Sequence, residues 1–462
     1  MSGLLSGTSI PSPAVSALSA LARKHRVPGA QLAIHHGGTT TASEVGELEC
    51  RTGRRVTRDA AFPIGSITKY FTATVAMILV ADGDVDLDAP AGDYVPELGD
   101  LGAMLSLRHL LSHTSGLPDS PELGGMSTLT LRRYVAEHVS HMDLVLPPGA
   151  GFSYSSPGYA VVGRLIEAVT GMPWSEAVEL ILLRPLGIEP AFADLPGTKP
   201  ARRAFATGHS VHSCAGRTRP VRQSRVPADA PAGALTASAV DLVKLGQIHI
   251  GPGVPHLVPA ACAHQMREPV QCADPFGLAD GWGLGLAVYR HETADWVGHD
   301  GNADGTSCYL RINPADGWVI ALTTNANTGA ALWQDLLAEL AQAGVPISLP
   351  RAPALAGRRA MLPPGCAGQY ANGDLEYAVT AGSHGSPHLS MDGEDFMPLA
   401  LHDDLTFSML DPDSGRRMLD GRFIREPATG RVCGIQVGGR LARKQAFSAT
   451  APSAGQRLTP AG

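Results

Sequence analysis

The sequence predicts an α+β fold in which an antiparallel sheet is flanked by helices and followed by a small all-β unit. Three observations carry this prediction. Apolar residues at helical spacing dominate residues 67–183, strand-like segments fill 282–326, and short alternating segments separated by Gly, Asp and Asn occupy 366–444. Helices and strands do not alternate in a repeating βαβ rhythm, so an antiparallel sheet is favoured over a doubly wound one.

A hairpin and most of the helices come first. Residues 29–49 form two predicted strands joined at Gly37-Gly38, a strong hairpin signal. His35 and His36 flank this turn, and because no third ligand is spaced nearby we interpret them as a strand end rather than a metal site. The helical patterns of this half cover residues 15–24, 67–82, 106–112, 128–140, 158–170 and 174–183.

The strands of the sheet come later. Residues 196–232 are rich in Pro, Arg and Ala with poor periodicity, so we expect a long irregular excursion over a substrate cleft. A helix is predicted over 238–250. From Trp282 onward four strand-like segments are separated by turn residues, which indicates an antiparallel meander. A final helix, 329–344, packs back on the sheet.

The sequence pattern changes after residue 345. Residues 346–365 have the composition of a linker between domains. About eight short strands follow over 366–448, and their spacing is typical of a small β-barrel or sandwich. We therefore divide the chain into a domain of residues 1–345, the linker, a lipocalin-like β-barrel over 366–448, and a disordered tail over 449–462.

Composition narrows the class of function. The net charge is -7 without a long basic run, which argues against nucleic acid or a membrane surface as the partner. No window reaches the roughly 18 uninterrupted apolar residues of a membrane span, and no signal peptide is recognisable at the N-terminus. The seven cysteines are scattered without a C-x-x-C pair, so a cytoplasmic protein without cofactor or metal is expected.

One pair of residues carries the strongest chemical signal. Ser66 and Lys69 in "GSITK" lie on one face of the helix predicted over 67–82, and Lys69 alone among the five lysines has Ser three residues before it. Pro63 and Gly65 place Ser66 at the helix N-terminus, where backbone N–H groups favour negative charge. A desolvated amine at Lys69 is able to take the serine proton. A capping serine beside a surface lysine fits the local pattern equally well.

Further motifs resolve that choice. The segments "FPIGSITK", "LRHLLSHTSGLP", "PPGAGFSYSSPGY", "RPLGI", "GALTASAVDLVKLG" and "GHDG" occur in this order between residues 62 and 301. Over roughly residues 12–340 the chain resembles the penicillin-recognising serine enzymes, which include class C β-lactamases, DD-peptidases and related esterases and transacylases. The resemblance implies a β-lactamase/transpeptidase-like fold and an acyl-enzyme mechanism.

The resemblance also implies roles for single residues. Ser66 would be the acylated nucleophile, Lys69 its proton acceptor, and Tyr154 the tyrosine that passes protons to the leaving group. His299 would bind substrate or support Tyr154, and Gly301 would let the substrate backbone approach. The N–H groups of Asn302 and Ser66 would form the oxyanion hole.

One residue departs from the family pattern. Ser156 stands where the family's second motif usually has Asn, and a hydroxyl is shorter and offers fewer donors than a carboxamide. Because of this difference, the sequence does not predict a hydrogen bond from residue 156 to Lys69 or to a substrate amide. It also argues against β-lactamase activity. His109, His113 and Ser115 are interpreted as scaffold behind the site, and Asp119 receives no role.

Three functions follow from these motifs. The first is a biosynthetic acyltransferase or peptide cyclase that takes an ester or thioester donor and an amine acceptor, similar to stand-alone penicillin-binding-protein-type thioesterases. Its partners would be a small or peptidyl acyl donor, carried on a carrier protein in some cases, and an amine. The second is a cytoplasmic esterase or DD-peptidase-like hydrolase. The third is a binding module without turnover, which Ser156 alone favours.

Overall fold

A computed structural model describes residues 12–119, 129–347 and 361–445, apart from short gaps at 194, 199–201, 213–214, 224–225, 383–384, 395–396 and 411–416. An antiparallel sheet of seven strands forms its centre, which confirms the predicted fold class. In spatial order the strands are β2 (Thr39–Gly46), β1 (Gly29–His36), β11 (Trp318–Thr324), β10 (Thr306–Asn313), β9 (Trp296–Ala303), β8 (Ala287–Tyr289) and β7 (Gly281–Trp282).

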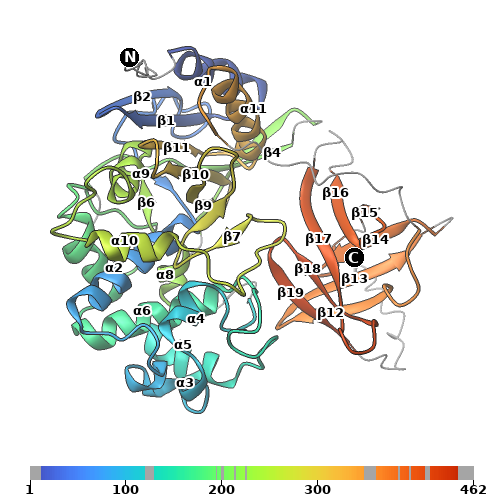
Figure 1. Cartoon of the computed structure of the whole chain (residues 1–462). Helices are drawn as coiled ribbons and strands as arrows, with labels where there is room; N and C mark the ends of the chain where they lie inside the picture. Colours follow the sequence, from blue (N-terminus) through green and yellow to red (C-terminus); the bar gives the residue numbers. More distant parts are fainter. Residues whose placement is uncertain are drawn as a thin grey trace, which may run out of the picture.

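Helices cover both faces of this sheet (Figure 1). Successive strand residues point to opposite faces, so Leu32 and Ile34 pack with α1 (Ser12–Lys24) and α11 (Gly329–Gln342), whereas Ala33 joins the core on the other side. On that side lie α2 (Ile67–Asp82) and α9 (Ala239–Gly246). Because both faces are covered, every residue of β10 and β11 is buried.

A helical part adjoins the lower end of the sheet in Figure 1. Its core is continuous with that of α2 and is built largely from Leu, Val and Ala. Its helices are α3 (Leu101–Met104), α4 (Leu107–Leu111), α5 (Leu131–Glu137), α6 (Ser156–Thr170), α7 (Trp174–Ala177), α8 (Ala230–Gly233) and α10 (Ala260–Arg267). A two-stranded ribbon of β3 (Phe62–Pro63) and β6 (Thr236–Ala237) leads into α2.

The region expected to be irregular contains a hairpin. β4 (Gly208–His212) pairs with β5 (Arg217–Val221), although neither segment has strong hydrophobic alternation. The pairing is held from outside, because the His209 N–H donates to the Gly305 carbonyl at 2.8 Å and the His209 ring bonds the Asn325 carbonyl at 2.8 Å. Hydrogen bonds to distant parts of the chain therefore stabilise two strands that the hydrophobic periodicity of the sequence does not predict.

The C-terminal part closes into an eight-stranded barrel. Its strands are β12 (Gly368–Asn372), β13 (Leu375–Ala381), β14 (Pro387–Met391), β15 (Met397–Leu401), β16 (Thr406–Leu410), β17 (Arg417–Arg425), β18 (Val432–Val437) and β19 (Arg440–Lys444). Pairing of Tyr370 with Lys444 closes the ring. Of the two architectures left open by the sequence, the barrel is the one formed.

Buried side chains fill the barrel. Tyr370, Tyr377, Phe407, Phe423 and Ile435 belong to one apolar cluster. Large side chains of this kind are what an eight-stranded barrel needs to fill its interior. The predicted domain boundaries and the likeness to lipocalins stay predictions, and the predicted tail and most of the linker lie outside the described residues.

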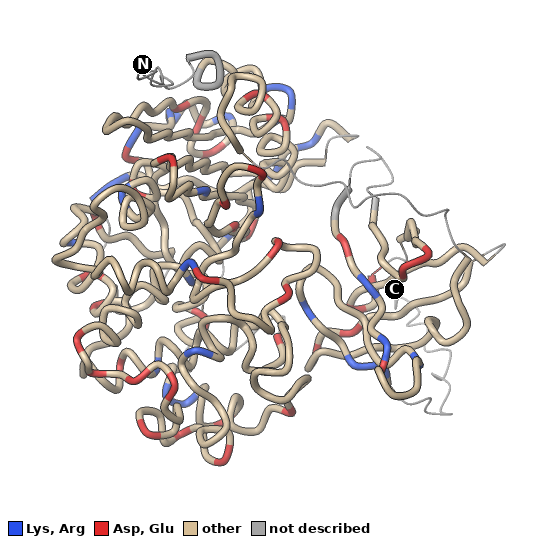
Figure 2. Tube along the Cα trace, viewed as in Figure 1, with Lys and Arg blue, Asp and Glu red and all other residues tan. Residues whose placement is uncertain are grey.

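The surface is mixed in charge. Acidic and basic residues are interspersed over both parts of the chain (Figure 2). The large apolar side chains exposed in the described part are Met104, Leu180 and Met361, which lie on separate elements. No helix among the described residues combines the length and apolarity needed to cross a bilayer.

Candidate active site

Ser66 lies at the N-terminal end of α2, on a tight turn. Gly65 has φ +52°, and a Cβ on it would lie 2.1 Å from the carbonyl oxygen of Asn302 in β9. The turn thus needs glycine both for its backbone angle and for the close approach of β9. The Ser66 side chain is half-buried and makes no capping hydrogen bond to its own helix. Its oxygen is instead directed to Lys69.

The Lys69 ammonium makes three hydrogen bonds. Its Nζ lies 3.3 Å from Ser66 Oγ, 3.3 Å from Ser156 Oγ and 3.1 Å from the Ala232 carbonyl oxygen. Lys69 is only 1% exposed, although lysine is a polar residue and the rest of α2 is largely apolar. Three acceptors match the three donors of an ammonium group. A neutral amine in this position would donate to Ser156 and Ala232 and accept the Ser66 proton.

Residues 154–156, which take the place of the family's second motif, lead into α6 and bring Tyr154 beside Lys69. The Lys69 Nζ lies 5.0 Å from the centre of the Tyr154 ring. The tyrosine is 6% exposed, and its ring stacks on His113 with 4.2 Å between centroids. The indole of Trp282 stands edge-on to Tyr154 at 5.8 Å. Aromatic rings therefore fix the plane of the phenol.

Ser156 begins α6 and reaches Lys69. The sequence placed this hydrogen bond in doubt, whereas the structure gives a distance of 3.3 Å between Ser156 Oγ and Lys69 Nζ. The helix start makes the contact possible, because Ser155 caps α6 by accepting from the Gly158 N–H at 3.2 Å. The Ser156 N–H donates to Asp119 Oδ1 at 2.9 Å. A short side chain suffices here since the helix itself approaches Lys69.

His299 lies on β9 and is 2% exposed. Its Nδ1 is 2.6 Å from the Asp300 carbonyl oxygen, which can only accept, so Nδ1 carries the proton and Nε2 is an acceptor. Nε2 is buried and has no partner among the described residues. Burial, and next the positive charge of Lys69, lower the pKa of His299 to about 4. It is a neutral hydrogen-bond acceptor in the site.

Gly301 brings β9 against the turn that carries Ser66. A Cβ on Gly301 would lie 1.9 Å from the Ile64 carbonyl oxygen and 3.0 Å from the Ile67 nitrogen. The glycine is therefore required for contact with the protein's own backbone, and not only for approach of a substrate. Asn302 follows as an exposed residue paired with Ser307 of β10. The backbone of 301–302 thus lies next to the N-terminus of α2, as an oxyanion hole would require.

The barrel contributes to the same site, which the sequence did not indicate. The turn between β18 and β19 places the Gly439 carbonyl 3.0 Å from the Tyr154 nitrogen. Arg440 pairs with Asp119 at 2.6 Å and lies 5.2 Å from the centre of the Tyr154 ring. Asn372 of β12 receives the Asp119 N–H at 2.6 Å and donates to Ser153 Oγ at 3.1 Å.

Asp119 and Arg440 are two of the residues at the site to which the sequence assigned no role. Asp119 binds the Ser156 N–H with one carboxylate oxygen and Arg440 with the other. Neither residue belongs to a pattern with recognisable spacing, because the contact joins positions 321 residues apart. Strands β17, β18 and β19 form the side of the barrel nearest the first domain (Figure 1).

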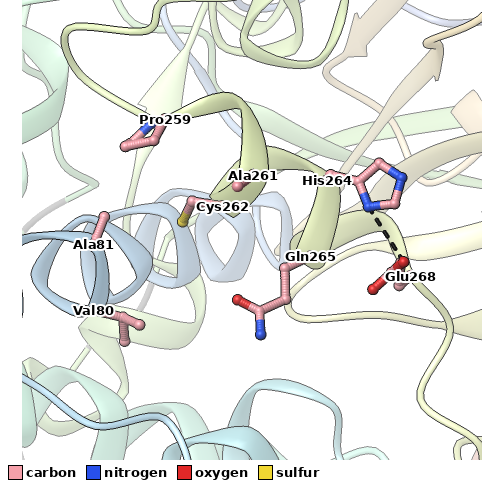
Figure 3. A pocket seen from close by; sticks show the side chains of 8 residues that line it. All are labelled: Val80, Ala81, Pro259, Ala261, Cys262, His264, Gln265 and Glu268. Atoms are coloured by element: carbon pink, nitrogen blue, oxygen red, sulfur yellow. Dashed lines mark ion pairs between the residues drawn. The ribbon is translucent and has the colours of Figure 1, made fainter.

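A separate hollow lies at the far end of α2. It measures about 500 Å³ and is lined by Val80, Ala81 and residues of α10 (Figure 3). Cys262 lines it, but burial raises the pKa of this thiol to about 11. His264 pairs with Glu268 at its rim, 3.3 Å apart. The helix rises about 1.5 Å per residue, so this hollow lies roughly 20 Å from Ser66 and is distinct from the site.

Comparison with known proteins shows what the chain is similar to. The β-lactamase family profile matches residues 14–344. Penicillin-binding protein 4 of Amycolatopsis lactamdurans is 33% identical over 332 residues, which cover 70% of this chain and 87% of the relative. The crystal structure of SurE superposes with a TM-score of 0.82 at 38% identity, covering 94% of this chain and 99% of SurE.

A third relative is a D-stereospecific amidohydrolase from Streptomyces sp., with a TM-score of 0.58 and 26% identity. It covers 72% of this chain and 99% of its own. SurE thus resembles the chain over both parts, whereas the amidohydrolase matches a smaller share of it. The chain belongs to the β-lactamase family, within the penicillin-recognising serine enzymes.

Proposed function

We propose that this enzyme takes an acyl group from an ester, thioester or amide donor onto Ser66 and transfers it to an amine. The contact between Lys69 Nζ and Ser66 Oγ, 3.3 Å long in a buried setting, carries the proposal. In this proposal Lys69 is the proton acceptor, and Ser66 is a nucleophile at a helix N-terminus. Both features are needed to make a hydroxyl attack a carbonyl carbon.

Acylation would proceed in one proton-transfer cycle. The neutral Lys69 amine accepts the Ser66 proton as the serine oxygen bonds to the donor carbonyl carbon. Backbone N–H groups of Ser66 and Asn302 stabilise the oxygen that becomes negative. The Tyr154 hydroxyl supplies a proton to the leaving group, and the Lys69 ammonium restores it. The amine nitrogen then bonds to the acyl carbon as the ester bond to Ser66 Oγ breaks, and the proton lost by the amine passes by the reverse route to the Ser66 oxygen.

Burial of the reacting groups supports transfer over hydrolysis. Lys69, Tyr154 and His299 are each at most 6% exposed, so a bound amine competes with little water for the acyl-enzyme. The barrel adds to this burial by placing Gly439 and Arg440 beside Tyr154. Similarity to SurE extends over the barrel as well as the catalytic part.

The proposed substrates contain a D-configured residue. SurE has been solved with D-Leu, and the Streptomyces relative is described as D-stereospecific. We therefore expect the donor to be a small molecule or peptide whose acyl group or acceptor has D configuration. A carrier-protein-bound thioester is one form such a donor would take.

The test is a product analysis with N-acetyl-D-leucyl and N-acetyl-L-leucyl N-acetylcysteamine thioesters. Each is incubated with and without a primary amine, and amide and free acid are quantified by mass. We expect amide to exceed acid with the D donor, and Ser66→Ala to form neither. Free acid alone, whatever amine is present, would establish the hydrolase alternative. A wild type that acquires no acyl adduct would indicate a binding module.

A further inference from the structure

His113 has an unusual backbone for its position. It follows α4 by two residues, has φ +57° and is 1% exposed. A residue with a Cβ in the left-handed region is uncommon and persists only where its surroundings hold it there. At this position a glycine or asparagine would adopt the same angle more readily. The histidine is thus retained for something its side chain does.

Its contacts surround Tyr154. The His113 carbonyl accepts from the Ser153 N–H at 2.9 Å, and Nδ1 accepts from the Ser155 N–H at 3.1 Å. Between these two bonds the imidazole stacks on the Tyr154 ring, with 4.2 Å between centroids and 29° between planes. One residue therefore holds the backbone on both sides of Tyr154 and one face of its ring.

The hydrogen bond at Nδ1 also fixes the proton of this histidine. Because Nδ1 accepts, the proton of the neutral ring is on Nε2, the opposite tautomer to that of His299. Nε2 is buried without a partner among the described residues. Burial, followed by the positive charge of Lys69, holds the pKa of His113 well below its usual range. The His113 ring is therefore neutral, and its contacts fix its orientation.

We infer that His113 is a positioning residue for Tyr154, setting where the phenol stands relative to Ser66 and Lys69. The inference rests on the proposed function, in which Tyr154 protonates the leaving group. A purely structural histidine would tie α4 to residues 153–155 and affect folding alone. A positioning residue affects donors with poor leaving groups most, because these depend on the proton from Tyr154.

The experiment compares acylation rates of His113→Ala, His113→Asn and the wild type, using a p-nitrophenyl ester and an alkyl thioester of one acyl group. Asparagine keeps an acceptor near the Nδ1 position and tolerates positive φ, so it should restore much of the rate. We expect His113→Ala to lower thioester acylation about ten- to hundredfold and ester acylation less than threefold. His113→Asn should stay within tenfold of the wild type with both donors.

Two controls separate positioning from folding. His109→Ala removes a histidine that caps α4 in a capping box, and should lower stability while leaving both rates of the folded enzyme within twofold. Tyr154→Phe should add little to the loss in His113→Ala, because both changes disable one group. An equal loss of acylation rate with both donors in His113→Ala would overturn the inference about His113 but not the proposed function. The same holds if the rate losses of His113→Ala and Tyr154→Phe multiply in the double variant. A wild type that forms no Ser66 adduct with the ester would overturn the proposed function with it.

Discussion

The Tyr154 backbone N–H donates to the carbonyl of Gly439, joining the segment that carries this tyrosine to the last hairpin of the barrel across 3.0 Å. The adjoining Arg440 reaches Asp119, whose other oxygen holds the Ser156 N–H. The second motif is therefore held from two sides, by His113 on one and the barrel on the other. The predictions below test what each contact does.

Arg440→Met should slow acylation tenfold or more. The change removes the hydrogen-bond partner of Asp119 Oδ2. Leaving a mostly buried carboxylate oxygen without a partner destabilises the folded protein by about 1–3 kcal/mol. The Ser156 N–H bond would shift as Asp119 moves toward solvent. Arg422→Met is the matched control, because Arg422 pairs with Asp274 across the same interface and its other partners are Gln436 and Phe276 rather than Asp119 or Ser156. Acylation by a chromogenic ester should stay within twofold in the control, and equal losses would contradict the prediction.

Lys69→Ala should lower acylation of Ser66 by about 10²- to 10⁴-fold, the contribution typical of a positioned general base. The measurement is single-turnover release of the leaving group, followed by intact mass. Lys244→Ala, which removes a partly exposed lysine whose ammonium bonds the Gly187 carbonyl, is the control and should keep the rate of the wild type. A rate near normal for Lys69→Ala would exclude it as the base.

Ser156→Asn should raise the rate with amide and β-lactam donors relative to esters. The carboxamide supplies two donors where the hydroxyl supplies one. Turnover of a chromogenic cephalosporin and of a p-nitrophenyl ester gives the ratio, which we expect to increase about tenfold. Ser156→Ala removes an acceptor of Lys69 and should slow both donors. An unchanged ratio in Ser156→Asn would show that the hydroxyl does not set this preference.

Stability should fall on acidification, in part through His299. Its pKa is about 4 in the folded protein against 6.5 for an unperturbed ring, so between these values the unfolded chain binds more protons. Stability from this group is complete above pH 6.5 and falls by roughly 3 kcal/mol as the pH approaches 4. Burial also lowers the pKa of His113 and His249, which adds to the trend.

Urea unfolding at pH 7 and pH 4.5 measures this effect. His299→Asn keeps a donor for the Asp300 carbonyl but does not titrate, so its stability should depend less on pH than that of the wild type. The variant His291→Asn, which alters a partly exposed ring, provides the comparison and should follow the wild type. An identical pH dependence in His299→Asn would contradict the assigned direction.

Local spacing predicted much of this site from the sequence. Ser66 and Lys69 are three residues apart on one helix, and α2 begins and ends where its apolar pattern does. The contacts of Asp119 and Asn372 could not be predicted in this way, since they depend on the packing of a barrel against a loop. The hairpin of β4 and β5 was missed for a related reason, because it is stabilised by hydrogen bonds to distant loops rather than by an apolar face.

Ser153, which accepts a hydrogen bond from the Leu441 N–H, precedes it by 288 residues in the chain. A ribosome must therefore synthesise nearly the entire polypeptide before the second motif acquires its supports. Until β19 emerges, Tyr154 would be held by His113 alone and would lack its contacts with the barrel. A prematurely terminated chain would therefore keep only one of the two supports of this tyrosine, and we expect it to be acylated more slowly than the full-length protein.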